Sequence, residues 1–237
     1  MPTPEPSEQA TTVQANERGA ALALLPIAAT IVYYLLPPSL QDRTLVQFSP
    51  QVLAYLALVL WTTHNRPVLP LLGLHPQGLR SGLSWGLVIG LGLGCLNTVM
   101  ILKAVPAMGF DIMFLKDTPH ARIPLALMLP WLILCIAVFV EINFRGFLLG
   151  RLAVLESPLW QSPLTRRLSP LALITSAVAF SFDPFMVTTF QHLHWIAIWD
   201  GLLWGAVRLK TNNLYISIIA HAVEVMVMYS TVRMALG

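Results

Sequence analysis

Apolar positions along the chain form long, nearly unbroken runs that are separated by short polar or proline-rich segments. Seven such runs cover residues 19–36, 46–63, 82–102, 123–153, 168–183, 187–207 and 213–236. A helix needs roughly 20 apolar residues to cross about 30 Å of hydrocarbon, and most of the runs approach that length. Prolines mark some of the breaks, as at Pro37-Pro38 after the first run. The pattern predicts an all-α, polytopic membrane helix bundle of about seven transmembrane spans.

The composition is typical of a chain whose solvent is a bilayer. Hydrophobic residues make up 56% of the chain and charged residues only 11%, and the mean hydropathy is +0.70. An ordinary soluble domain carries about 25% charged residues, so this chain has too few to cover a water-exposed surface. We therefore expect an integral membrane protein that contacts membrane lipids. The net charge is only +3, and the longest run of basic residues is the pair Arg166-Arg167. Both observations argue against nucleic acid as a partner.

The first 17 residues, MPTPEPSEQATTVQANE, are polar and rich in proline and glutamate. They predict a disordered tail over residues 1–17, and residues 18–237 are expected to form a single membrane domain. No basic segment precedes a short apolar one, so the first apolar run is expected to remain as a membrane anchor. Lysine and arginine are more frequent in the predicted loops on the N-terminal side of the membrane, which predicts a cytoplasmic N-terminus.

A glycine pattern stands out in the third apolar run. Gly86, Gly90 and Gly94 recur every four residues and so share one face of a helix. Small residues at this spacing let two helices approach each other closely in a membrane. We expect this face to serve packing and not chemistry.

Two charged residues interrupt the fourth run, in the stretch IAVFVEINFRGFLLGRLAVL. Glu141 and Arg145 are four residues apart, so on a helix they share a face. A charge near the bilayer centre costs roughly 2.5–3.5 kcal/mol, and such residues tend to face a bundle interior or a wet cavity. If the helix began at Arg122, Glu141 would lie about 28 Å along it and the pair would emerge at the far interface. Pro130 offers a restart instead, and a helix over 131–152 would place Glu141 near its middle, in a buried site.

Two further constellations place polar residues in apolar surroundings. His221 and Glu224 lie three residues apart in the last run, on one helical face, which favours a site over simple helix packing. Asp183 precedes a proline and is expected to mark a helix end, where a capping role competes with a functional one. His192 and His194 are two residues apart and would point in nearly opposite directions on a helix, so they cannot both serve one face.

In the order of its motifs, the chain resembles the CPBP family, which comprises the CAAX proteases and bacteriocin-processing enzymes. The resemblance covers roughly residues 70–230 and rests on VEINFRGFLLGRL followed by GLLWGAVRLKTNNLYISIIAHAVEV. It implies a membrane endopeptidase in which a glutamate of the first motif and a histidine of the second activate a water molecule. A last histidine and an asparagine would stabilise the oxyanion, and the participation of a metal in the family has been argued both ways.

The chain departs from the family pattern at two positions. Glu141, Arg145 and His221 match the motifs Glu-Glu-x-x-x-Arg and His-x-x-x-Asn, but Val140 stands at the first glutamate and Val225 at the asparagine. A valine cannot abstract a proton or donate a hydrogen bond from its side chain. These departures favour a site that has lost part of its catalytic apparatus.

The second motif of the family, Phe-x-x-x-His, has two placements in this chain. Phe190 and His194 satisfy it literally, but His194 lies only 27 residues before His221, which is short for the family. The other placement, at AFSFD, has the better spacing and puts Asp183 at the histidine position. The catalytic residues that the resemblance implies are therefore Glu141, Arg145 and His221, with Asp183 or His194 as a further member.

The sequence leaves three functions open. The first is a CPBP-type intramembrane endopeptidase that cleaves a membrane-associated peptide near the cytoplasmic face. The second is a catalytically degenerate pseudoprotease that binds a peptide or membrane-protein partner, or serves as a scaffold, and Val140 and Val225 favour it. The third is a transporter or channel component, although no inverted repeat supports it.

A divalent metal such as zinc would be compatible with Glu141, His221 and one more ligand, but no HExxH-like spacing supports it, so the cofactor is undetermined.

Overall fold

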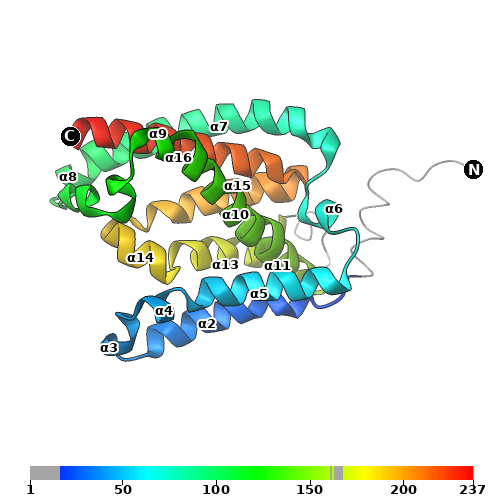
Figure 1. Ribbon diagram of the computed structural model, residues 1–237. Coiled ribbons are helices and arrows are strands. Elements are labelled where there is room, and N and C mark those ends of the chain that lie inside the picture. Colours follow the sequence, from blue (N-terminus) through cyan, green and yellow to red (C-terminus); the bar gives the residue numbers. More distant parts are fainter. Residues whose placement is uncertain (1–16, 161, 163–167, 237) are drawn as a thin grey trace, which may run out of the picture.

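The computed structural model describes residues 17–160, 162 and 168–236, and every regular element within them is a helix. The helices form one bundle, with α2 and α5 along one edge and α7 along the opposite edge (Figure 1). The first helix begins at one end of the bundle, and α16 ends at the other end (Figure 1). The predicted all-α fold class is confirmed for the described residues.

The elements follow one another along the chain in three groups. The first group contains η1 (Ala20–Ala23), α2 (Leu24–Leu35), α3 (Pro38–Gln41), α4 (Thr44–Gln47), α5 (Ser49–His64) and α6 (Val68–Leu72). The second group contains η2 (Pro76–Gly78), α7 (Leu79–Val99), η3 (Met100–Ala104), α8 (Val105–Ala107), η4 (Met113–Asp117), η5 (Pro119–Arg122), α9 (Leu125–Leu127) and η6 (Met128–Leu132). The third group contains α10 (Ile133–Glu141), η7 (Ile142–Leu148), α11 (Leu149–Glu156), η8 (Ser157–Leu159), α13 (Pro170–Ser181), α14 (Pro184–Phe190), η9 (Gln191–Leu193), α15 (Ile196–Thr211) and α16 (Leu214–Leu236).

Three helical stretches of the described chain are long and apolar enough to cross a membrane, namely Pro76–Ala107, Ile133–Leu159 and Leu214–Leu236. A fourth crossing results if Pro170–Ser181 and Pro184–Leu193, which meet at a bend of 50°, count as one broken span. The prediction of about seven spans is therefore not confirmed, although a membrane-spanning, all-helical protein is supported.

The remaining apolar runs form helices that are shorter than the sequence pattern suggested. Helices α5 and α15 contain 16 residues each, and α2 contains 12. One backbone break lies inside an apolar run: Gln191, with a positive φ of 46°, divides the run 187–207 between α14 and α15. Hydrophobicity gives no sign of this break, so the run alone could not reveal it.

The fourth apolar run contains the break that Pro130 predicted. Leu129 is extended, with φ −105° and ψ 129°, because the residue before a proline is pushed away from the helical region. The helix then continues through α10, the π-helical segment η7 and α11. Glu141, the last residue of α10, consequently lies inside the span Ile133–Leu159 and away from both of its ends.

Helices α7 and α16 pack against each other along the glycine face of α7. A Cβ atom added at Gly90 would lie 2.6 Å from the carbonyl oxygen of Ala220, and the other glycines of this face meet α16 at similar distances. No side chain fits such a gap, so the glycines permit the approach. The predicted packing role of this face is confirmed, and it brings Asn97 of α7 beside Glu224 of α16.

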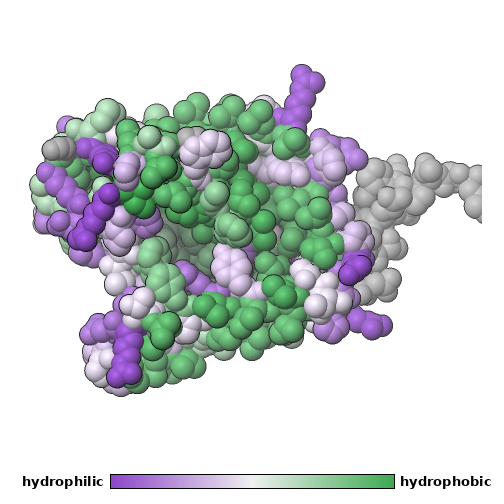
Figure 2. Space-filling view, in the orientation of Figure 1, coloured by the Kyte–Doolittle hydropathy of each residue, from purple (hydrophilic) through white to green (hydrophobic). Residues whose placement is uncertain are grey.

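The outer surface carries an apolar band, with hydrophilic side chains gathered toward the two ends of the bundle (Figure 2). Large apolar side chains such as Leu35, Val88 and Phe139 are exposed. Exposing this apolar surface to water would cost free energy, whereas contact with lipid tails would not. The band supports an integral membrane protein.

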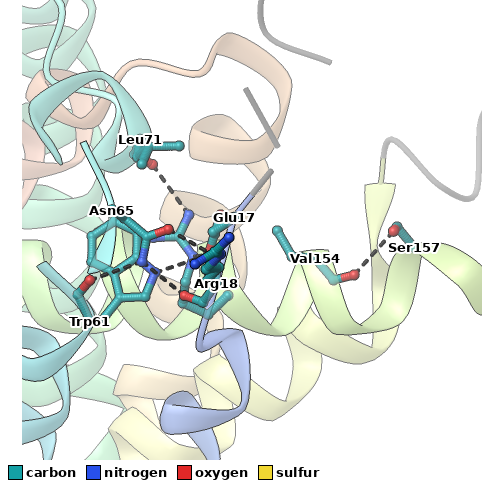
Figure 3. A network of polar contacts seen from close by, with 8 residues as sticks. Glu17, Arg18, Trp61, Asn65, Leu71, Val154 and Ser157 are labelled. Carbon is teal, nitrogen blue, oxygen red and sulfur yellow. Dashed lines mark hydrogen bonds and ion pairs between the residues drawn. The ribbon is translucent and has the colours of Figure 1, made fainter. Parts of the chain in front are cut away.

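A buried polar network ties the start of the described chain to the bundle (Figure 3). The carboxylate of Glu17 forms an ion pair with Arg151 of α11 and accepts a hydrogen bond of 3.1 Å from the indole of Trp61. The side chain of Asn65 pairs with the backbone of Arg18, accepting from its N–H at 2.9 Å and donating to its C=O at 2.8 Å. The Arg151 guanidinium also lies 4.2 Å from the centroid of the Trp61 ring.

Glu17, which the sequence pattern assigned to the disordered tail, is therefore packed against the bundle with its side chain buried. The pattern missed it because the Arg151 partner is remote in sequence. Residues 1–16 of the predicted tail lie outside the described residues, so the division into a tail and a single membrane domain stays a prediction.

Candidate functional site

A cavity of about 560 Å³ lies inside the bundle, among α5, α10, α13, α14, α15 and α16. Most of its wall is apolar. Its polar and charged lining residues are Gln51, Tyr55, Lys116, Thr118, His120, Asn143, Asp183, Asp200, His221, Glu224, Tyr229 and Arg233. A largely apolar cavity of this size with a few polar groups is typical of a site that binds a small molecule or part of a peptide.

The loop after α8 and the last turns of α16 supply a polar rim to this cavity. Lys116 and His120 come from the loop, and Arg233 comes from α16. Burial lowers the pKa of His120, whose ring stacks on Phe190 with centroids 6.1 Å apart. Because Arg233 stands in the last turn of α16, the rim lies at the end of the bundle where α16 ends. The first helix begins at the opposite end (Figure 1).

Glu141 and Arg145 form an ion pair in the interior of the bundle. Oε1 of Glu141 lies 3.2 Å from Nη1 of Arg145, and the two side chains are 0% and 1% exposed. The guanidinium lies 4.2 Å from the centroid of the Phe180 ring and 5.0 Å from that of Trp204. The prediction that this pair faces the bundle interior is confirmed, and the alternative of an interfacial pair is wrong.

A π-helical segment, η7, begins directly after Glu141 and contains Arg145. Wide turns of this kind are rare inside α-helices and occur frequently at functional sites, because they displace side chains from the ordinary helical register. Here the segment continues a span while it turns Arg145 toward the aromatic rings of neighbouring helices.

His221 of α16 joins the ion pair from a neighbouring helix. Its Nδ1 lies 2.9 Å from Oε1 of Glu141, so the predicted convergence of these two residues is confirmed. Its ring stacks on the indole of Trp204, with centroids 4.7 Å apart and planes inclined by 20°. Because the carboxylate engages Nδ1, Nε2 is the ring nitrogen that remains available to the cavity that His221 lines.

A second polar cluster joins three helices beside His221. Nδ2 of Asn97 in α7 lies 3.1 Å from Oδ2 of Asp200 in α15 and 2.7 Å from Oε1 of Glu224 in α16. The indole of Trp199 donates to Oδ1 of Asn97 at 3.0 Å and so fixes the orientation of the amide. Asp200 and Glu224 are 4% and 2% exposed, and both line the cavity.

The sequence pattern singled out Glu224 but missed Asn97 and Asp200. A signal existed for Asn97, because it lies three residues after Gly94 and therefore continues the glycine face that packs on α16. Asp200 is the one acidic residue of the apolar run 187–207, and an acidic residue in such a run is itself a candidate functional residue.

Asp183 combines the capping role with a place on the cavity wall. Its side chain accepts a hydrogen bond of 3.0 Å from the backbone N–H of Phe185 at the start of α14, which confirms the predicted helix end. It also accepts a hydrogen bond of 2.8 Å from Nε2 of Gln51. Since it lines the same cavity as His221, it remains a candidate of the site.

His194, the other candidate for the second motif, lies apart from the cavity lining within the described chain. Its Nδ1 contacts the carbonyl oxygen of Gln191, and its ring meets the Phe182 ring edge-on at 5.1 Å between centroids. These contacts are those of a structural residue at a helix junction.

The two positions at which the chain departs from the family pattern both face the cavity. Val140 and Val225 are lining residues. The apolar substitutions therefore stand on the wall of the site itself. At these two points the cavity wall lacks the polar side chains that the family pattern has there.

The described residues contain no group of three or more His, Cys, Asp or Glu side chains arranged to hold a metal ion. Of the zinc ligands that the sequence suggested, Glu141 and His221 are in contact with each other. The cofactor therefore stays undetermined.

The family model described as "Type II CAAX prenyl endopeptidase Rce1-like" matches residues 122–227, somewhat less than half of the chain. The matched segment contains Glu141, Arg145, Asp200, His221 and Glu224. The resemblance drawn from the motifs is thereby confirmed for this segment. No curated protein and no solved structure matches the chain.

Proposed function

We propose that this chain, whose residues 122–227 match the Rce1-like family, is an intramembrane endopeptidase of the CAAX-protease type. The observation that carries the proposal is the placement of His221 on the cavity wall with its Nδ1 fixed by Glu141. A histidine held at one nitrogen by a buried carboxylate is oriented to act as a general base through the other nitrogen.

In the proposed reaction, Nε2 of His221 removes a proton from a water molecule that attacks the peptide carbonyl carbon. Glu141 stabilises the imidazolium that forms, and Arg145 holds Glu141 in place through the 3.2 Å ion pair. The apolar cavity wall excludes bulk water, which strengthens these electrostatic interactions.

The substrate class follows from the chemistry of the cavity. Its largely apolar wall suits a membrane-associated peptide with apolar side chains or a lipid-modified end. The description of the matching family, a CAAX prenyl endopeptidase, supports the same class. The expected partners are therefore membrane lipids and a peptide or membrane protein.

The test is cleavage of a labelled membrane-peptide library by purified protein in lipid nanodiscs. We expect wild type to release defined products and both Glu141→Ala and His221→Ala to lose them. A thermal unfolding measurement on each variant distinguishes lost chemistry from lost folding. Equal cleavage by all three proteins would contradict the proposed role of these residues.

A catalytically degenerate pseudoprotease is the second candidate, and one observation favours it. Val140 and Val225 line the cavity where the family pattern has a glutamate and an asparagine. In this alternative the cavity binds a membrane partner without cleaving it. It predicts that wild type cleaves nothing in the library and that the double variant Val140→Glu, Val225→Asn gains cleavage.

The sidedness of the bundle is part of the proposal. We propose that the N-terminus is cytoplasmic, which places the start of α2 on the cytoplasmic side. Since Arg233 places the cavity rim at the end of the bundle where α16 ends, this orientation puts the rim on the far side of the membrane and disfavours cleavage near the cytoplasmic face. The peptide then approaches from the far side of the membrane or laterally.

Single cysteines on a background without Cys95 and Cys135 test this orientation. With a cytoplasmic N-terminus, a membrane-impermeant thiol reagent added to intact cells labels a cysteine at exposed Lys116 and spares one at exposed Arg80. The reverse pattern would return the cavity rim to the cytoplasmic face. We further propose that the shorter apolar helices α2, α5 and α15 also lie in the bilayer, which would bring the count toward seven.

A further inference from the structure

Asp200 and Glu224 form a buried carboxyl pair that the role assigned to His221 does not use. The two groups come from different helices and are held by the same amide, that of Asn97. Burying two carboxyl groups together costs free energy unless their charge is compensated. A pair that lines a cavity beside His221 therefore calls for a chemical explanation.

The position of the two carboxyl groups favours a proton between them. Oδ2 of Asp200 and Oε1 of Glu224 lie 3.1 and 2.7 Å from the same atom, Nδ2 of Asn97, and Oε2 of Glu224 is buried with no hydrogen-bond partner among the described residues. Two ionised carboxylates this close repel each other, and neither can donate a hydrogen bond. One proton held between them satisfies the geometry.

The charges around the pair favour the same state. The groups that face it are Arg145 of η7, Glu141 of α10 and His221 of α16. Arg145 lies within electrostatic reach of all three carboxyl groups, so one guanidinium serves three potential negative charges. In a buried site, where like charges repel strongly, one shared proton reduces the excess negative charge.

We propose that Asp200 and Glu224 share one proton and act as the general acid of this site, giving that proton to the carbonyl oxygen of the bound peptide. The inference rests on the proposed endopeptidase function. It supplies a donor where the family's asparagine is replaced by Val225, because Glu224 precedes that position on the same helix and faces the same cavity. A carboxylic acid kept neutral in an apolar site is an effective donor to a developing oxyanion.

The proton balance of the step is complete. The water oxygen bonds to the carbonyl carbon while its proton moves to Nε2 of His221, and the proton of the Asp200–Glu224 pair moves to the carbonyl oxygen. The resulting tetrahedral diol then collapses: the C–N bond breaks, and the imidazolium proton moves to the leaving nitrogen. A hydroxyl proton of the diol returns to the carboxyl pair, so both groups recover their starting states.

Isosteric variants test the proposal because they remove the titrating proton and keep the size of the side chain. In Glu224→Gln, the amide oxygen still accepts the hydrogen bond from Asn97, and in Asp200→Asn the same holds for that side. Asp42→Asn is the matched control, since Asp42 is exposed in the link between α3 and α4. The pH profile of cleavage and the infrared carbonyl band of a protonated carboxylic acid are measured for each protein in nanodiscs.

We expect wild-type cleavage to fall at high pH, where the carboxyl pair loses its proton. Glu224→Gln and Asp200→Asn should each lose about 10²- to 10⁴-fold in rate, the typical contribution of general acid–base catalysis. Their residual activity should lack the fall at high pH, and the infrared band should disappear. Asp42→Asn should keep the wild-type profile and band.

Three results would overturn the acid role. If wild type lacks the infrared band of a protonated carboxylic acid, Asp200 and Glu224 do not share a proton. Wild-type rates and an unchanged high-pH fall in both isosteric variants would show that cleavage depends on His221 without the pair. If wild type cleaves no peptide at all, the endopeptidase function fails, and the acid role fails with it.

Discussion

Nδ1 of His221 lies 2.9 Å from Oε1 of Glu141, although 80 positions of the chain separate the two residues. The same carboxylate oxygen lies 3.2 Å from Arg145. One buried carboxylate oxygen of Glu141 thus contacts both the His221 ring and the Arg145 guanidinium. The arrangement explains why an apolar span contains a glutamate and an arginine, because each would be costly in lipid without the other.

Arg145→Ala is expected to destabilise the protein strongly, because it leaves Glu141 buried without its cation. Breaking a buried pair typically costs about 3–5 kcal/mol in the free energy of unfolding. Denaturation in mixed micelles measures this quantity. The exposed Arg80 provides the control, and Arg80→Ala should change stability by less than about 0.5 kcal/mol.

A double variant separates this pair from simple loss of packing. Glu141→Ala combined with Arg145→Ala should cost less than the sum of the two single variants, because neither charge is then stranded. Strict additivity of the two losses would contradict the ion-pair explanation.

Gly90→Ala tests the close contact between α7 and α16. The added Cβ would lie 2.6 Å from the carbonyl oxygen of Ala220, so the helices must separate, and the melting temperature should fall. Gly92 on the same helix has nothing within 4 Å of an added Cβ. Gly92→Ala should therefore stabilise the helix by up to about 1 kcal/mol, in line with helix propensity. Equal effects of the two substitutions would argue against the glycine face as the contact.

Glu17 gives a pH-dependent prediction for the stability of the whole bundle. Burial raises the pKa of Glu17 above its ordinary value of 4.5, and this effect exceeds the opposing attraction of Arg151. The folded protein then holds this proton more tightly than the unfolded chain does. The contribution of Glu17 to the free energy of unfolding is therefore fully present below pH 4.5 and is lost as the pH rises through the raised pKa.

Glu17→Gln should remove this fall in the free energy of unfolding with rising pH. The prediction concerns the pH dependence and not the absolute stability of the variant at any one pH. Thermal unfolding of wild type and variant across a pH series measures the difference between the two curves. Asp42→Asn, which changes an exposed carboxyl group, should parallel wild type. Parallel curves for Glu17→Gln and wild type would mean that Glu17 does not titrate as the buried geometry implies.

The sequence predicted the parts of the site that are chemically unusual where they stand. Glu141, Arg145 and His221 are polar residues in apolar runs, and spacing placed Glu141 on one helical face with Arg145, and His221 on another with Glu224. Asn97 and Asp200 each carried a local signal that was missed, and their shared role depends on a contact between residues 103 positions apart. The span count exceeded the observed one because α5 and α15 contain only 16 residues each, and the break at Gln191 ahead of α15 cannot be read from hydrophobicity.

The most direct test of the account is the incorporation of heavy oxygen from labelled water into the cleaved peptide. Wild type and His221→Gln are incubated in nanodiscs with a cleavable membrane peptide in this water, and mass spectrometry reads the new carboxyl terminus. We predict one heavy oxygen in the wild-type product and a rate at least about 10²-fold lower for a folded His221→Gln variant. Cleavage by folded His221→Gln at the wild-type rate, with the same incorporation, would contradict His221 as the group that activates water.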